Sequence, residues 1–106
     1  MAGYNSLIKE TEKSKLLIQL SGELIIDNIE NIKKDLTIDL FNIDEITFET
    51  LNVDLMDMSF VQVLESFINT CSEGDKRIIL RLSLNEAEKA LLEKTGFQNY
   101  FVQTKN

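Results

Sequence analysis

The chain has 106 residues, of which 43% are hydrophobic and 27% charged, and 18 acidic against 11 basic residues give a formal net charge of −7. This length and composition are typical of one globular domain, which we expect to span residues 1–106 with a core at residues 4–102. The acidic balance argues against a nucleic-acid partner, because binding to a phosphate backbone depends on clustered Lys and Arg.

Histidine is absent and Cys71 is the single cysteine. Because histidine is the commonest general base and a usual zinc ligand, we expect neither a metal site nor a familiar catalytic constellation, and nothing demands a cofactor. Cys71 lies on a helical apolar stripe, which predicts a buried structural thiol. No stretch approaches the roughly 20 apolar residues of a membrane span and no signal peptide is evident, so we expect a cytoplasmic protein without membrane insertion.

The first half of the chain predicts a β-hairpin and a helix. The segments are an edge strand over residues 4–10, a polar turn over 11–14, a second strand over 15–21 and a turn over 22–24. Gly22 supplies a backbone position without side-chain bulk in that last turn. After two candidate N-caps, Asp27 and Asn28, apolar residues recur at helical spacing and predict a helix over residues 28–41.

The centre of the chain predicts a strand that leads into a helix. Residues 46–54 form the strand, and apolar residues in both of its pleat registers predict that both faces are at least partly covered, as in the middle of a mixed sheet. Apolar residues at helical spacing then predict a helix over residues 59–72, with Gly74 placed as its C-terminal cap. Either Asp57 or Ser59 can cap this helix. A rigid, exposed polar turn between a strand and a helix is a suitable place for a binding site. The alternative is that the segment is only a strand, a cap and a core helix.

The last third predicts one more strand, over residues 77–82, and a helix that begins at a capping box of Ser83 and Glu86 and ends at Gly96. Residues 97–102 predict an edge strand or a segment packed over the core, and residues 103–106 are expected to fray. The order is β-β-α-β-α-β-α-β. Because parallel strands need helical crossovers, the predicted class is α/β, a mixed, mostly parallel sheet of four to five strands with three or four helices packed on it.

This order of elements resembles the STAS domain, the fold of bacterial anti-sigma-factor antagonists. The resemblance rests on the Gly22-Glu23-Leu24 turn, on the segment VDLMDMS at residues 53–59 and on the closing Thr95-Gly96-Phe97. In that family the first serine after the aspartate is phosphorylated by a partner kinase that doubles as the anti-sigma factor, and the unphosphorylated form captures that kinase. The resemblance therefore implies a non-enzymatic module that binds an anti-sigma factor/serine kinase, or another STAS-pathway protein, and regulates transcription.

The sequence departs from the family pattern at this turn. Asp57 matches the aspartate and Ser59 the second serine, but Met58 stands at the phosphoacceptor position, Phe60 replaces the next glycine and Ile25 replaces an acidic residue. An unswitched or differently switched antagonist is implied, with Ser59 as the remaining candidate for phosphorylation or, alternatively, a helix cap worth about 1 kcal/mol. We expect Asp57, Met58, Ser59 and Phe60 to form the partner-binding turn, in which Phe60 is either an exposed anchor or a core residue.

Other functions and assemblies stay open at this point. The chain is alternatively an accessory or scaffold subunit of a membrane transporter or of a signalling assembly, where small domains of this family also occur. An enzyme would have to use Asp54, Asp57 and Glu65, carboxylates near one turn that are more simply solvated charges and a cap. A homodimer is also open, and a long unpaired sheet edge would favour it.

Overall fold

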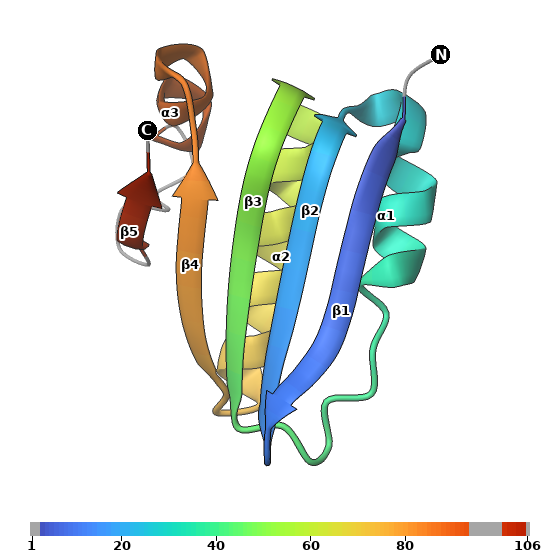
Figure 1. The fold of residues 1–106 in the computed structure, drawn as a ribbon, viewed down its shortest axis with the longest axis vertical. Helices are drawn as coiled ribbons and strands as arrows, with labels where there is room; N and C mark the ends of the chain where they lie inside the picture. Colours follow the sequence, from blue (N-terminus) through green and yellow to red (C-terminus); the bar gives the residue numbers. More distant parts are fainter. Residues whose placement is uncertain (1–2, 94–100, 106) are drawn as a thin grey trace.

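One twisted five-stranded sheet organises the chain (Figure 1). The computed structural model describes residues 3–93 and 101–105. In chain order the elements are β1 (Tyr4–Glu12), β2 (Lys15–Leu24), the 3₁₀ helix η1 (Ile26–Asn28), α1 (Ile29–Asp35), β3 (Glu45–Met56), α2 (Met58–Glu73), β4 (Arg77–Ser83), α3 (Glu86–Glu93) and β5 (Phe101–Lys105). The strands lie in the order β1-β2-β3-β4-β5, and only the β1–β2 pair is antiparallel. The predicted α/β class and element order are confirmed.

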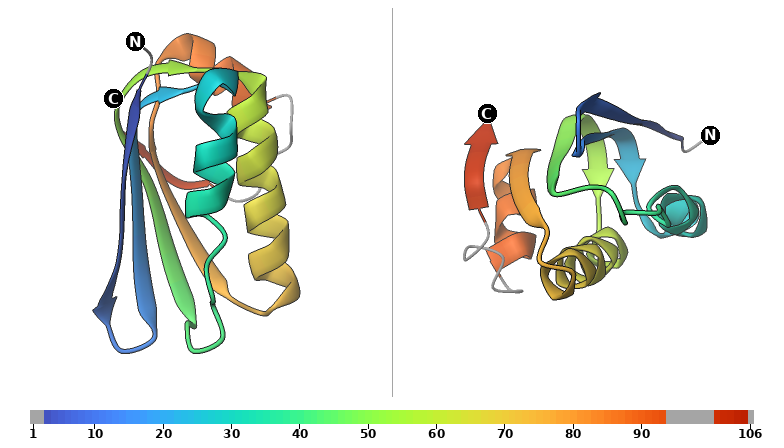
Figure 2. Two further views of the ribbon diagram at one scale, coloured as in Figure 1. Left: turned by 90° about the vertical axis from the view of Figure 1, so that its right-hand side faces the viewer. Right: turned by 90° about the horizontal axis from the view of Figure 1, so that it is seen from below.

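Helices α1 and α2 lie side by side on one face of the sheet, and the core lies between them and the strands (Figure 2). The predicted apolar stripe of α2 is buried throughout, at Phe60, Leu64, Phe67, Ile68 and Cys71. The ring of Phe67 packs on that of Phe48 in β3, with centroids 5.8 Å apart. Burial raises the pKa of the Cys71 thiol to about 11, against a smaller opposite effect of Lys76, so the predicted buried structural thiol is confirmed.

Strand β3 is central in the sheet, as predicted, but among the described residues its second face is only partly buried at Glu45, Thr47 and Glu49. The face away from α1 and α2 carries a polar row in which Gln19 Nε2 donates to Glu49 Oε1 at 2.6 Å. Two register shifts against β2 occur along the second half of β3, where Asn52 has φ of +49°. These bulges turn Val53 toward the core and leave Leu55 exposed, so apolar residues occupy both pleat registers without a second covering layer.

The helix predicted over residues 28–41 is too long at its C-terminal end. Beyond α1 the side-chain hydroxyl of Thr37 donates to the carbonyl of Lys33 at 2.9 Å. The Asp39 side chain then accepts the backbone N–H of Phe41 at 3.0 Å, which closes a local turn. Such side-chain bonds offer the backbone an alternative to the helical ladder. The segment between α1 and β3 therefore runs as an irregular loop.

The predicted capping box of α3 lies in the wrong register. Asn85 and Glu88 form it instead: the N–H of Asn85 donates to Glu88 Oε1 at 3.0 Å, and the N–H of Glu88 donates to Asn85 Oδ1 at 2.8 Å. Ser83 is still the last residue of β4, and Leu84 is buried. Glu86 is consequently the first residue of α3 and not part of the cap.

All five strands extend further than the sequence predicted, β3 to Met56 and β4 to Ser83 among them. β1 continues to Glu12, and β2 continues through Gly22-Glu23-Leu24, which the sequence assigned to a turn. The final edge strand is confirmed as β5, but residues 103–105, which were expected to fray, belong to it. Gly96, residues 97–100 and residue 106 lie outside the described residues.

Candidate functional site

The turn between β3 and α2 is organised by the carboxylate of Asp57, the N-cap of α2. Its Oδ1 accepts the backbone N–H of Ser59 at 3.0 Å and that of Phe60 at 3.4 Å. Ser59 also donates its hydroxyl to the same oxygen. Of the two predicted caps, Asp57 is therefore the one that satisfies the free N–H groups of the helix, and Ser59 supports it from the first turn.

The second oxygen of Asp57 reaches across to another element. Oδ2 accepts the backbone N–H of Ile26, in η1, at 2.9 Å, while the N–H of Asp57 donates to the carbonyl of Leu24 at 3.2 Å. The loop is held further by Asn28, whose Nδ2 donates to the carbonyl of Glu23 at 2.7 Å instead of capping a helix as predicted. One carboxylate thus joins the start of α2 to the segment that leaves β2.

These contacts decide the charge state of Asp57. Burial by itself raises the pKa of the carboxyl, but the hydrogen bonds donated by Ser59, Ile26 and Phe60 outweigh it and hold the pKa below its ordinary value of 3.8. The group is therefore ionised at neutral pH, and both of its oxygens already accept hydrogen bonds. Its chemistry is that of a positioning group that fixes a turn, not that of a poised general base.

Of the two alternatives for Phe60, the structure shows the core residue, because its side chain is fully buried and is not an exposed anchor. Met58 is half-buried and packs in part on that core. The exposed apolar side chains near the turn are instead Ile26, which is 61% exposed, and Leu55, which is 52% exposed. Sequence reasoning missed both, since no periodicity predicts which way a side chain points in a 3₁₀ turn or beyond a β-bulge.

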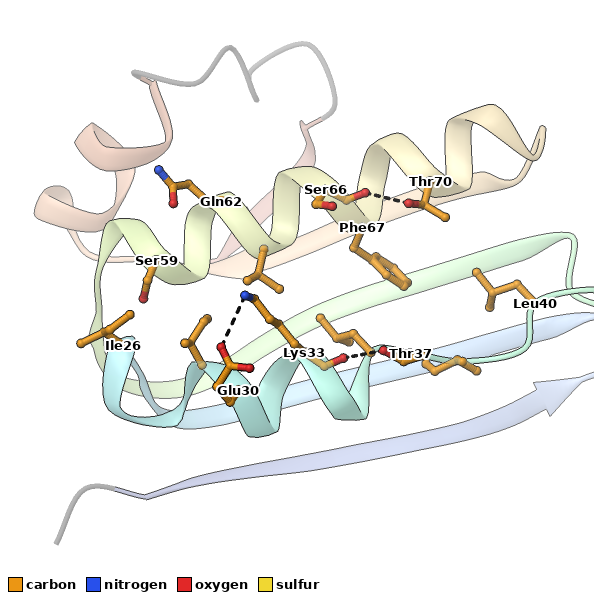
Figure 3. A pocket seen from close by; sticks show the side chains of 14 residues that line it. Ile26, Glu30, Lys33, Thr37, Leu40, Ser59, Gln62, Ser66, Phe67 and Thr70 are labelled. Carbon is orange, nitrogen blue, oxygen red and sulfur yellow. Dashed lines mark hydrogen bonds and ion pairs between the residues drawn. The ribbon is translucent and has the colours of Figure 1, made fainter.

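A groove of about 770 Å³ continues from this turn between α1 and α2 (Figure 3). Its lining combines apolar side chains, among them Ile29, Leu36, Val63 and Phe67, with polar ones along α2, namely Ser59, Gln62, Ser66 and Thr70. At its mouth Lys33 Nζ lies 3.5 Å from Glu30 Oε2. Ile26 and Ser59 line one end, so the Asp57 turn and the groove form one continuous surface. The sequence did not predict this groove, since it predicted a first helix that continues to residue 41.

The carboxylates weighed for catalysis are not brought together in this groove. None of Asp54, Asp57 and Glu65 lines it. In the described part of the chain, no three potential metal ligands are grouped to hold an ion. Within the same residues, no helix is both long and apolar enough to cross a membrane.

Comparison with known proteins gives one family and a consistent set of structures. The family model described as STAS domain matches residues 6–106. The unphosphorylated anti-sigma factor antagonist SpoIIAA is similar over 93% of this chain and 87% of its own, with a TM-score of 0.76 and 17% identity. The phosphorylated form of the Bacillus cell fate determinant SpoIIAA is similar over 93% of this chain and 90% of its own, with a TM-score of 0.73 and 17% identity. An anti-sigma factor antagonist from Mycobacterium paratuberculosis is similar over 98% of this chain and 87% of its own, with a TM-score of 0.80 and 10% identity. A search of curated proteins finds no match.

Proposed function

Because the chain belongs to the STAS family, we propose that it is a non-enzymatic interaction module of the anti-sigma-factor antagonist type that acts in the cytoplasm. It binds an anti-sigma factor/serine kinase and thereby regulates transcription. The observation that carries the proposal is the double role of Asp57, whose two oxygens hold Ile26 and the first turn of α2 together. A turn fixed in this way is a preorganised contact surface, which lowers the entropic cost of binding.

The chemistry of this surface favours a partner that is basic around an apolar patch. Ile26, exposed over 61% of its side chain, supplies the apolar anchor. Asp27, the next residue, is exposed, Asp57 accepts the backbone N–H of Ile26, and the sequence contains no Lys or Arg between Lys34 and Lys76. An acidic surface steers a basic partner by long-range attraction, while the buried apolar contact supplies affinity.

Phosphorylation is not expected to switch this surface in the usual way. Met58, at the family's acceptor position, has no hydroxyl. A phosphate on Ser59 would remove the proton that its hydroxyl donates to Asp57 and would place like charges in contact. We therefore propose that the partner is bound constitutively, through Asp57, Met58 and Ser59 together with Ile26, while Phe60 supports the turn from the core.

Calorimetric titration of the purified chain with the ATP-bound anti-sigma kinases of the source organism tests the proposal. Ile26→Asp should weaken binding at least tenfold, since it places a charge in the apolar contact. Leu7→Asp is the matched control, because Leu7 is also exposed, over 45% of its side chain, but lies on β1 away from the turn. Absence of binding by the wild-type chain, or equal losses in both variants, would overturn the proposal.

The same variants separate the alternative role in a transporter or signalling assembly. In affinity capture with identified proteins, an antagonist retains an anti-sigma kinase, and Ile26→Asp loses it. A scaffold subunit instead retains transporter subunits or other STAS chains, with no dependence on Ile26. The second pattern would replace the proposed function with the alternative.

A further inference from the structure

The groove exists because two neighbouring helices differ in length. Helix α2 has 16 residues and α1 has seven, which at about 1.5 Å per residue gives lengths of about 24 and 10 Å. The second half of α2 is therefore flanked by the loop that follows α1 (Figure 2). Ile38 and Leu40 of this loop are half-buried and line the groove beside Phe67 and Thr70. The far end of the groove, away from Asp57, is thus apolar and has no helix over it among the described residues.

The same loop carries a second unpartnered feature, the ring of Phe41. At 84% it is the most exposed large hydrophobic side chain of the described residues, and it directly follows Leu40 of the groove lining. Its backbone is fixed on both sides: the N–H of Phe41 donates to Asp39 Oδ1 at 3.0 Å, and the N–H of Ile43 donates to the carbonyl of Leu40 at 3.0 Å. An aromatic side chain held in water by an ordered backbone loses little entropy on insertion into a pocket.

We propose that a second copy of this chain occupies the groove, in a twofold dimer in which Phe41 of each copy inserts between α1 and α2 of the other. A twofold interface uses the same surface patch on both copies, so the patch has to be complementary to itself. The loop after α1 supplies both parts, because the exposed Phe41 directly follows Leu40, which lines the apolar hollow. The dimer needs no other protein and does not depend on the proposed function.

The charges around the two features are complementary as well. The loop that carries Phe41 contains Asp39 and Asp44 and no basic residue. The last turn of α1 beside the groove carries Lys33 and Lys34. The ion pair of Lys33 with Glu30 is 3.5 Å long between side chains that are 55% and 84% exposed, so Lys33 is easily shared with an incoming carboxylate. Insertion of Phe41 therefore brings acidic loop residues toward basic helix residues in both halves of the dimer.

Sedimentation equilibrium of the full chain, from low micromolar to near-millimolar concentration, tests this dimer. The wild-type chain should show a reversible monomer–dimer equilibrium. Phe41→Ser should raise the dissociation constant at least tenfold, since one buried aromatic anchor is lost from each half. Leu7→Ser is the control, because it removes an exposed apolar side chain from β1, outside the groove, and should leave the equilibrium unchanged.

A second variant tests the hollow instead of the projection. Ser66 is exposed and lines the groove, so Ser66→Glu places a carboxylate there without touching the core; it should repel the acidic loop of the other copy and weaken the dimer. A mixture of Phe41→Ser and Ser66→Glu chains keeps one intact contact, in which Phe41 of the Ser66→Glu chain enters the unchanged groove of the Phe41→Ser chain. The mixture should therefore associate more strongly than either variant alone. A wild-type chain that is monomeric at every concentration, or a dimer that Phe41→Ser leaves unchanged, would overturn the proposal.

Discussion

Replacement of Asp57 by alanine should destabilise the protein through one identifiable set of hydrogen bonds. The substitution removes the acceptor for the N–H groups of Ser59, Phe60 and Ile26, at 3.0, 3.4 and 2.9 Å, and for the Ser59 hydroxyl. Loss of an N-cap costs about 1 kcal/mol. Loss of the Ile26 bond adds about 0.5–1 kcal/mol, since water can replace part of it. We therefore expect the free energy of unfolding to fall by about 1.5–2 kcal/mol.

Urea denaturation followed by far-ultraviolet circular dichroism measures this loss. With a slope of about 1–3 kcal/mol per molar urea, the midpoint should move down by about 1 M. Asp54→Ala is the control, because Asp54 is an exposed carboxylate of the same strand end. A surface change of that kind should stay within about 0.5 kcal/mol. Equal midpoints for the two variants would refute the assignment of Asp57 as the group that holds the turn.

The pH dependence gives an independent check on the same carboxylate. Because the folded-state pKa of Asp57 lies below the ordinary value of 3.8, the ionised group stabilises the fold above that value. The stabilisation is lost as the pH falls through the lowered folded-state pKa. The difference in unfolding free energy between wild type and Asp57→Ala should therefore be constant near neutral pH and should shrink below pH 3.8. A gap that stays constant into that acidic range would contradict the role of the carboxylate.

Three substitutions and one alkylation reaction test other parts of the chain. Phe60→Ala should lower the free energy of unfolding by about 3–5 kcal/mol in urea titrations, because Phe60 is fully buried. Gly22→Ala should lower the melting temperature, since Gly22 has φ of +92° and an added Cβ would lie 2.7 Å from the carbonyl oxygen of Gly3. Met58→Ser restores a hydroxyl at the family's acceptor position, and the proposed kinase partner should add a phosphate detectable by intact-mass measurement in this variant and not in wild type. The Cys71 thiol, with its pKa raised to about 11, should be alkylated slowly until urea unfolds the chain.

Helix α2 was predictable because every signal for it is local. An aspartate cap, an apolar stripe at helical spacing and a terminal glycine all agree, and the helix predicted over residues 59–72 is observed at Met58–Glu73. Gly74 accordingly donates its N–H to the carbonyls of Thr70 and Cys71, at 3.2 and 3.1 Å. Where all local preferences predict the same helix in this way, tertiary packing does not change its position.

The start of α3 could not be predicted, because two equivalent local patterns compete there. Both Ser83 with Glu86 and Asn85 with Glu88 have the spacing of a capping box. The choice is made by the sheet, since the N–H of Ser83 donates to the hydroxyl oxygen of Thr50 at 3.2 Å and keeps Ser83 in β4. Long-range hydrogen bonds of this kind are absent from any local sequence window.

The residues of the candidate site also differ in whether local sequence or a long-range contact determines their position. Asp57 was recognisable from its position between a strand and a helix, because capping is a local property. The exposure of Ile26 was not, because it follows from a hydrogen bond to Asp57, 31 positions along the chain. Phe60 lay on the apolar stripe of α2 four residues before Leu64, and this helical spacing predicts burial more directly than a comparison with a family glycine predicts exposure.

The proposed binding surface and the proposed loss of the switch concern different atoms of one turn. The carboxylate of Asp57 reaches the backbone of Ser59, Phe60 and Ile26, and none of these bonds uses the side chain of Met58. The geometry of the turn therefore does not depend on whether a phosphoacceptor is present. Under the proposed function, methionine at that position leaves the turn in place and removes only the hydroxyl that a kinase would phosphorylate. Under the same proposal, Met58→Ser should add a phosphorylation site while leaving the geometry of the turn unchanged.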